Sequence, residues 1–272
     1  MAVDERREFR RLTRWVLIWS SFALFFFLVL LPLTSTFKFA FEDGIGGFWD
    51  AISEAAAVNA LKNSAIVATL ATMINMFVGI LIAYVIVRYS FPGRDVFRAL
   101  IDLPIAIPTA VVGLSLMMLY GPMGLLGPIL EDSGIQVMMA LPGVLLAHIF
   151  VTFPFMIRSV SVSLEKLDVS QEEAAQTLGA TRAQTFIHVV LPSIRSGLVA
   201  GTALTFTRSL GEFGATLFVA GGMIQTAPLY IYYLSDSKFD FQSATSMAIL
   251  LMVLPFVLLL VLNRFVDWME GR

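Results

Sequence analysis

Residues 170 to 192 read S-Q-E-E-A-A-Q-T-L-G-A-T-R-A-Q-T-F-I-H-V-V-L-P, a polar insert between long apolar runs. Its first four residues fit a capping box, in which Ser170 caps a helix start and the Glu173 carboxylate reaches back. Gly179 can take the left-handed conformation that ends a helix, and Thr181 to Gln184 repeat the capping pattern. The sequence therefore predicts a helix, a sharp glycine turn and a second helix. We call residues 170 to 192 the EAA segment, after the letters at positions 173 to 175.

The composition around this segment is strongly apolar. The chain has 272 residues, of which 58% are hydrophobic and 14% charged, and its mean hydropathy is +0.83. Soluble domains rarely reach this balance, so we expect a polytopic membrane protein. The sequence has no cysteine, which excludes a disulfide framework and thiolate metal sites, and its two histidines are too far apart for a local metal motif. The net charge of −2 gives no indication of a nucleic-acid partner.

Uncharged stretches long enough to cross a bilayer as helices occur five times, since about 20 residues suffice. They are Trp15–Phe37, Asn63–Val87, Leu103–Leu130, Ser133–Ile157 and Phe241–Asn263. A sixth, from about residue 196 to 220, is interrupted only by Arg208 and Glu212. The first stretch is too long for a typical signal peptide and no cleavage-like site follows it, so we expect it to be retained. The sequence predicts an all-α membrane protein with six transmembrane helices.

Arginine and lysine are distributed unevenly between the two sets of loops. Fourteen lie in the N-terminus, the loops after the second and fourth spans, and the tail, whereas the opposite loops hold only Lys38, Lys62 and Lys238. Because basic loops stay in the cytoplasm, both termini and the EAA segment are expected there. Residues 38 to 62 are expected to form an external loop with a short helix near Trp49–Val58.

Two of the predicted spans carry features that are costly in lipid. The third opens with Pro104 and Pro108, which free backbone carbonyls that membranes tolerate only against protein or a wet cavity. The fifth carries Arg208 and Glu212 near the bilayer middle, four residues apart on one predicted helix face, where a charge costs on the order of 3 kcal/mol. The pair could hold helices together or line an anion path, and we favour the anion path. The candidate pathway or gate residues are Pro104, Pro108, Thr109, Arg208, Ser209, Glu212 and Phe213.

An enzyme and a passive anion channel are the alternative functions. Ser115, within Gly113-Leu114-Ser115-Leu116, and His148 superficially suggest the Ser–His dyad of an intramembrane protease. In such enzymes a second glycine stands where this chain has Leu116, and a serine in a membrane helix is usually a packing residue. No phosphate-binding G-x-x-x-x-G-K-[ST] motif occurs, so the chain is not expected to hydrolyse ATP itself. No catalytic and no metal-binding residue is predicted.

The EAA segment resembles the E-A-A-x3-G-x9-I-x-L-P loop of permease subunits of ATP-binding-cassette importers, with Val189 in place of the usual isoleucine. The resemblance, from about residue 59 to 264, is to type I permeases of the sulfate, molybdate and tungstate branch. The stretches 107–113, 119–122, 227–229 and 239–241 look like the sulfate permeases, residues 153–158 are similar to both kinds, and residues 208–216 look like the molybdate and tungstate permeases. The anion stays open.

The resemblance implies a function and a set of partners. Residues 1–58 would hold the N-terminus, first helix and external loop, 59–264 the permease domain, and 265–272 a cytoplasmic tail. The protein would be a multi-pass subunit in a prokaryotic cell membrane that moves a tetrahedral oxyanion by alternating access. Its partners would be a cytoplasmic ATPase dimer that carries ATP and Mg, a second permease subunit, an extracytoplasmic binding protein and lipid. The residues implied to couple to the ATPase are Glu173, Ala174, Ala175, Gly179, Leu191 and Pro192.

Overall fold

The computed structural model describes residues 2–222 and 224–270, with side chains for residues 13–222, 224–261 and 264. All regular elements in this part of the chain are helices. In chain order they are α1 (Ala2–Phe25), η1 (Phe26–Leu30), α2 (Leu31–Ala40), α3 (Gly44–Ser53), α4 (Ala55–Arg88), α5 (Arg94–Ala106), α6 (Thr109–Tyr120), α7 (Gly127–Asp132), α8 (Leu141–Lys166), α9 (Val169–Thr177), α10 (Arg182–Thr185), η2 (Phe186–Val190), α11 (Leu191–Ser193), α12 (Arg195–Leu210), α13 (Gly214–Val219), α14 (Ala227–Tyr232), η3 (Tyr233–Ser237) and α15 (Phe241–Glu270).

Four helical runs among the described residues are long and apolar enough to cross a membrane. They are Thr13–Ala40, Ala55–Arg88, Leu141–Lys166 and Phe241–Val261. Two bent pairs raise the number to six if each pair counts as one span: α5 with α6, bent by 106°, and Arg182–Ser193 with α12, bent by 67°. The all-helical membrane architecture is therefore confirmed, with four to six candidate spans.

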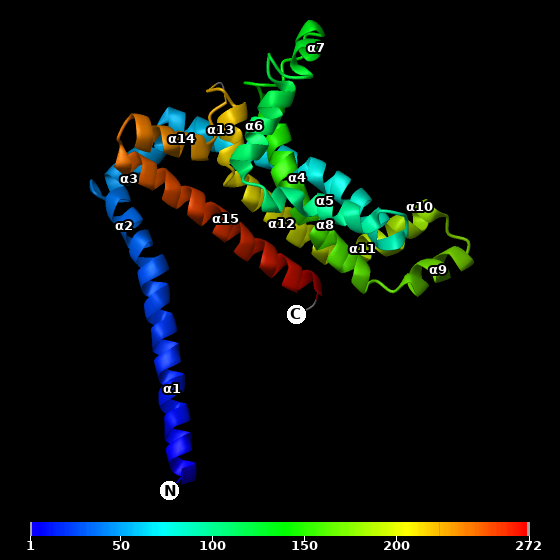
Figure 1. The fold of residues 1–272 in the computed structure, drawn as a ribbon, viewed down its shortest axis with the longest axis horizontal. Helices are drawn as coiled ribbons and strands as arrows, with labels where there is room; N and C mark the ends of the chain where they lie inside the picture. Colours follow the sequence, from blue (N-terminus) through cyan, green and yellow to red (C-terminus); the bar gives the residue numbers. More distant parts are fainter. Residues whose placement is uncertain (1, 223, 271–272) are drawn as a thin grey trace.

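The core of the molecule is the packing of α4, α8 and α12 against one another (Figure 1). Ser159 on α8 donates a hydrogen bond to the carbonyl oxygen of Gly197 on α12 at 2.9 Å, which indicates close approach of the two helices. α15 runs beside α12 and contacts α2 and α3 at its other end. Figure 1 places α9 and α10 at one end of the bundle, and α3 and α14 at the opposite end.

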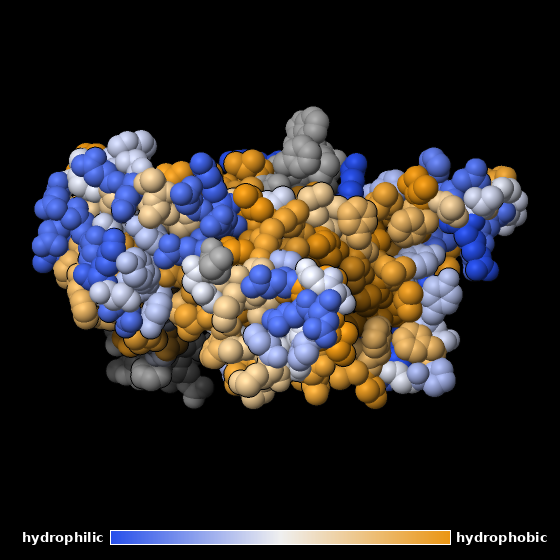
Figure 2. Space-filling view, turned by 90° about the horizontal axis from the view of Figure 1, so that it is seen from above, coloured by the Kyte–Doolittle hydropathy of each residue, from blue (hydrophilic) through white to orange (hydrophobic). Residues whose placement is uncertain are grey.

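The first helical run, α1–η1–α2, extends away from the bundle (Figure 1). Among its described side chains only Ala40 is buried, although the run contains a stretch long and apolar enough to cross a membrane. Figure 2 shows one face of the molecule, on which apolar side chains cover most of the middle apart from one polar patch, and polar side chains gather at the two ends. An apolar middle between polar ends is what a membrane-spanning bundle requires.

Several predicted boundaries were wrong. The third span does not run unbroken to Leu130, because Pro108 has no backbone N–H and holds Ile107 in an extended conformation (ψ 134°), so the chain breaks between α5 and α6. Pro104 lies inside α5 rather than opening a span. α8 begins later than expected, at Leu141, and continues through charged residues to Lys166.

The region before α4 also differs from the expectation. The expected short helix is α3, Gly44–Ser53, and the long helix α4 already starts at Ala55, inside the expected loop. Glu54, extended between the two helices, separates them.

At the other end of the chain, the predicted tail begins within α15, which continues to Glu270.

Candidate functional sites

The EAA segment begins with a helix whose N-cap lies two residues earlier than predicted. Asp168 is the N-cap of α9, and its carboxylate accepts a hydrogen bond from the Ser170 backbone N–H at 3.0 Å. The predicted capping box from Ser170 to Glu173 was therefore wrong, because an aspartate two residues upstream takes the capping position. Hydrogen bonds from Ser170 lower the pKa of Asp168 below its ordinary value.

The glycine turn follows the prediction. Gly179 has a φ of +93°, and the backbone N–H of Ala180 donates to the Ala175 carbonyl at 3.0 Å. Gly179 N–H donates to the Gln176 carbonyl at 3.0 Å, which completes a Schellman motif. The second predicted capping box is also present, with Thr181 and Gln184 bonded to each other's backbone N–H groups. Helix, glycine turn and helix are therefore the observed order.

The implied coupling residues face outward to different degrees. Glu173, Ala174, Gly179 and Pro192 are exposed, whereas Ala175 and Leu191 are half-buried. Leu178, at the turn, is 90% exposed. Beside it lies a hollow of about 380 Å³ lined by Ala175, Leu178, Gly179, Ala180, Gln184, Thr185, His188 and Val189. An exposed apolar side chain beside a hollow on a rigid turn suits contact with another protein.

Glu172, the residue before the EAA letters, was not among the predicted site residues. Glu172, not Glu173, is buried, and its Oε1 accepts a hydrogen bond from Arg88 Nε at 2.7 Å. Tyr84 donates its hydroxyl to Glu172 Oε2 at 3.3 Å. Tyr84 and Arg88 lie one turn apart at the end of α4, more than 80 residues upstream, so no local pattern indicates the contact. The one usable signal was a second acidic residue adjoining the EAA letters.

A second site forms where two helix breaks meet. The chain breaks between α5 and α6 at Ile107-Pro108, and between α12 and α13 at residues 211–213. α6 packs tightly on α13: a Cβ added at Gly113 would lie 2.5 Å from the Ala215 carbonyl oxygen, too close for any side chain. The Thr109 hydroxyl is likewise packed directly against Gly214. The structure therefore brings predicted residue Thr109 to the predicted 208–213 stretch, whereas Pro104 lies on the other side of the 106° bend.

The ionic pair in this site spans the second break. Arg208 is in the last turn of α12, and Glu212 lies beyond it, outside any helix. The expectation of one continuous helix through both residues was wrong, because the chain leaves the helix at Gly211. The ion pair nevertheless forms, with Arg208 Nη1 2.7 Å from Glu212 Oε2. Phe213 is half-buried, and its ring lies 5.3 Å from that of Tyr232 on α14.

Behind the pair lies a buried polar network centred on His148 of α8. His148 Nδ1 is 2.7 Å from the Ser209 hydroxyl, and Nε2 is 3.0 Å from the Thr216 hydroxyl. The imidazole thus bridges α12 and α13 across the break. The Thr152 hydroxyl, one turn along α8, donates to the His148 carbonyl and accepts from Asn75 Nδ2 on α4 at 2.8 Å. The network joins four helices through polar contacts in the apolar core.

This geometry does not support the protease alternative. Ser115 is exposed on α6, while both ring nitrogens of His148 are occupied by Ser209 and Thr216. The described residues contain no group of three or more histidine, aspartate and glutamate side chains arranged to hold a metal ion.

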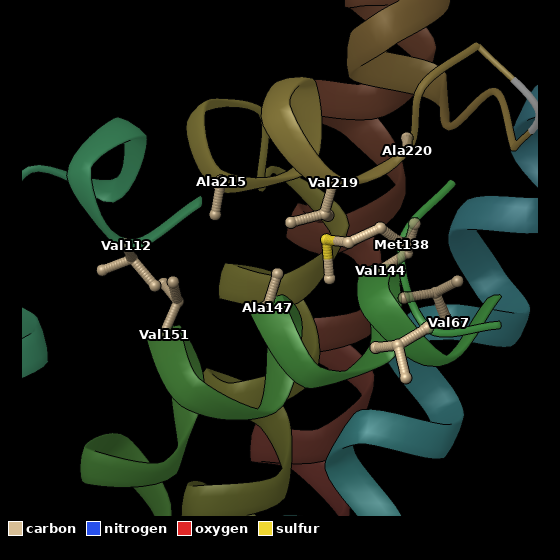
Figure 3. Close-up of a cluster of buried hydrophobic side chains, with 10 residues drawn as sticks. Val67, Val112, Met138, Val144, Ala147, Val151, Ala215, Val219 and Ala220 are labelled. Carbon is tan, nitrogen blue, oxygen red and sulfur yellow. The ribbon is translucent and has the colours of Figure 1, made fainter. Parts of the chain in front are cut away.

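An apolar cluster fixes α13 in place. Figure 3 shows Ala215 and Val219 of α13 above Ala147 and Val151 of α8, with Val112 of α6 at one side. All five are buried, and the cluster also contains Val67, Val137, Met138, Val144 and Ala220. Because α13 is only six residues long, we attribute its position to this packing rather than to intrinsic helix stability.

A helical membrane protein with an exposed helix–glycine–helix segment between two core spans, and no ATP-binding motif of its own, has the architecture of an importer permease. The chain belongs to the family of binding-protein-dependent transport system inner membrane components, whose model matches residues 75–272. It is 39% identical over 238 residues to the sulfate transport system permease protein CysT of Salmonella typhimurium, covering 87% of this chain and 86% of that one. It is 37% identical over 254 residues to the sulfate transport system permease protein CysW of Synechocystis sp., covering 92% of each chain.

Solved structures support the fold. A chain of a bacterial alginate ABC transporter in complex with alginate pentasaccharide-bound periplasmic protein superposes with a TM-score of 0.78 at 19% identity, covering 94% of each chain. A second structure of a bacterial ABC transporter, involved in alginate import, gives a TM-score of 0.75 at 20% identity, covering 96% of this chain and 98% of that one. The protein is thus a multi-pass permease subunit of an ABC transporter that works with a binding protein, and its ATPase is a separate subunit.

Proposed function

We propose that this chain is a permease subunit of an ATP-driven sulfate importer in a prokaryotic cell membrane. The observation that carries the proposal is the 39% identity to a sulfate permease over 87% of the chain. The EAA segment supports it, because its exposed turn supplies a rigid contact for an ATPase. Molybdate or tungstate is the second candidate substrate, favoured by the stretch from Arg208 to Thr216.

The proposed topology is six spans with both termini and the EAA segment in the cytoplasm. The excess of fourteen basic residues over three supports this orientation. α9 and α10 lie at the opposite end of the bundle from α3 and α14, as the topology requires (Figure 1). The permease domain proper is residues 59–264, between an N-terminal part, 1–58, and a short tail, 265–272.

The proposed assembly contains two permease subunits, a cytoplasmic ATPase dimer and an extracytoplasmic oxyanion-binding protein. The apolar run from Thr13 to Phe39 supports contact with lipid and a second permease subunit, since most of its side chains stay exposed although α15 contacts α2. ATP and Mg belong to the ATPase, and this chain needs no cofactor. The ATPase contacts are Glu173, Ala174, Ala175, Gly179, Leu191 and Pro192.

The proposed translocation site is the meeting point of the two helix breaks. Broken helices near the middle of a membrane protein expose backbone groups beside a path for polar solutes. Arg208 is one-third exposed and supplies the positive charge that a dianion requires, while Glu212 compensates that charge when no anion is present. Ser209, Phe213, Thr109 and the two prolines, Pro104 and Pro108, shape the breaks. Closure of the ATPase moves the EAA segments and switches the side to which this site opens.

Anion-stimulated ATP hydrolysis tests the proposal. The complex is reconstituted with its ATPase and binding protein, and hydrolysis is measured with sulfate, molybdate or tungstate. Stimulation by sulfate at the lowest concentration supports the proposal. Stimulation by molybdate or tungstate alone makes the chain a permease for those anions.

A further inference from the structure

The C-terminal end of α4 contacts the EAA segment both before and after the glycine turn, in α9 and in η2. Tyr84 donates its hydroxyl to Glu172 on α9, and its ring packs edge-on against Phe186 of η2, with centroids 5.5 Å apart at 90°. One residue of α4 thus contacts the segment on each side of the Gly179 turn. Neither contact involves the exposed residues proposed to touch the ATPase.

Arg88, the last residue of α4, adds two hydrogen bonds, one to Glu172 and one to the link between α8 and α9. Its Nε lies 2.7 Å from Glu172 Oε1, and its Nη2 donates to the Leu167 carbonyl at 3.1 Å. The side chains of Arg88 and Glu172 are only 11% and 7% exposed. A buried, hydrogen-bonded ion pair is much less screened than a surface pair and holds its partners in one geometry.

The covalent connections of the segment do not fix its orientation in the same way. Leu167 and Asp168 are extended, so α8 passes to α9 through a non-helical link. At the other end, the run to Ser193 meets α12 at a bend of 67°. α4, by contrast, is a single helix of 34 residues that packs on both α8 and α12. Halfway along it, Asn75 bonds Thr152 in the network that contains His148.

We propose that Tyr84, Arg88 and Glu172 form a clamp that makes the EAA segment move together with α4, so that force from the ATPase enters the core through the second span. The three are positioning residues, which act through the EAA segment rather than on the anion. The proposal rests on the proposed function only in that the ATPase moves this segment. The clamp links the segment to the core by non-covalent contacts with α4. These contacts act in addition to the two chain connections, which lead to α8 and α12.

The chain offers a matched control. Arg98 and Glu165 also pair across helices, α5 and α8, but at 3.6 Å and with side chains 41% and 56% exposed. The clamp variant is Arg88→Met with Glu172→Met, which strands no charge, and the control is Arg98→Met with Glu165→Met. Replacing a buried pair by apolar side chains of similar size is often neutral for stability, so the clamp variant is expected to insert and assemble.

The distance between α4 and α9 gives a readout independent of transport. Because the sequence has no cysteine, Leu81→Cys on α4 and Thr177→Cys on α9 can be spin-labelled without background. Both positions are exposed. In the full chain in lipid nanodiscs, the distance distribution is expected to be narrow for the parent and control proteins and broad for the clamp variant. Equal widths in parent and clamp variant overturn the clamp.

The second readout is sulfate-stimulated ATP hydrolysis per assembled complex. We expect the clamp variant to lose about fivefold or more, the lower end of typical coupling between two sites, and the control to keep the parental value. A broadened distance with undiminished stimulation contradicts the route through α4. If the parent complex itself shows no stimulation by any oxyanion, the proposed function fails, while the distance measurement still decides whether the clamp exists.

Discussion

Arg208 and Glu212 form an ion pair of 2.7 Å across the end of α12. The Glu212 carboxylate also accepts a hydrogen bond from a backbone N–H in the first turn of α13. Glu212 Oε1 accepts the Ala215 backbone N–H at 2.9 Å, while Oε2 faces Arg208 Nη1. Oε2 has no aligned hydrogen-bond donor among the described residues, so its compensation is the arginine charge. The exposed fractions differ sharply, at 34% for Arg208 and 1% for Glu212. The pair therefore joins the two sides of a helix break and leaves only its positive member accessible.

This asymmetry predicts unequal effects of the two single substitutions. Arg208→Met leaves a buried carboxylate without its cation and should cost about 3–5 kcal/mol of stability. Glu212→Gln leaves a cation that is one-third exposed, and glutamine keeps an oxygen for the Ala215 N–H, so the loss should be about half as large or less. Thermal unfolding of the two purified variants measures the difference. Equal losses would contradict the geometry of the pair.

The double variant Arg208→Met with Glu212→Gln separates transport from folding. No charge is stranded, so expression and assembly should recover largely to the parental level. Sulfate uptake should stay defective, because the cation that faces the anion is gone. Uptake that returns together with assembly would reduce the pair to a structural contact.

His148 should be needed for the shape of the second break. His148→Leu leaves the Ser209 and Thr216 hydroxyls without the ring nitrogens that they contact, at a cost of about 1–3 kcal/mol for each buried group left unpaired. Adding Ser209→Ala and Thr216→Val removes both stranded hydroxyls and should recover part of the lost melting temperature. As a control, Ser115→Ala should leave stability and transport unchanged, since Ser115 is exposed and apart from this network. Loss of activity in the control would revive the enzyme alternative.

Gly179→Val tests the turn of the EAA segment. Nothing lies within 4 Å of a Cβ built there, so the effect comes only from the backbone φ of +93°. β-branched residues strongly resist this region, whereas asparagine tolerates it. Gly179→Val should insert into the membrane but fail to retain the ATPase in co-purification, and Gly179→Asn should retain it. Wild-type assembly of the valine variant would show that the turn is not required for docking.

Alkaline pH should weaken the corner where α14 meets the start of α4. Tyr230 donates its hydroxyl to Glu54 at 2.9 Å, and burial together with this bond raises the pKa of Tyr230 from 10.0 to about 12. A raised pKa favours the neutral phenol in the folded state. Its contribution, at most about 3 kcal/mol, is therefore complete below pH 10 and lost as the pH rises towards 12.

Tyr230→Phe provides the comparison for this pH dependence. The difference in melting temperature between parent and variant should be constant up to about pH 10 and shrink above it. A difference that stays constant to pH 12 would show that the phenol does not titrate in this range.

The sequence predicted those features that arise from local chemistry. Long uncharged runs indicated the spans because a bilayer offers no water to backbone or charge. Gly179 and the Thr181–Gln184 box indicated the second half of the EAA segment, since both are properties of a few adjacent residues. The first cap was misplaced because Ser170 and Asp168 are both suitable capping residues and only the fold selects between them.

Features that depend on tertiary contacts were not predicted. The fourth span was predicted to end at Ile157, where the uncharged stretch ends. The helix continues, because Arg158 pairs with Asp102 at 2.7 Å. The break after α12 was missed although two glycines flank Glu212, because a favourable i,i+4 spacing argued for an unbroken helix. The contact from Arg88 to Glu172 joins residues 84 positions apart and has no signature in either neighbourhood.

Sulfate uptake into sealed proteoliposomes tests the central claim most directly. Vesicles contain the complete complex with ATP inside, and labelled sulfate and the binding protein are added outside. The account predicts accumulation of sulfate above the external concentration, dependent on ATP and on the binding protein, and its loss with Arg208→Met and Glu212→Gln together. Sulfate flux that only follows its gradient and is the same without ATP would contradict it, and would make the protein a passive anion channel.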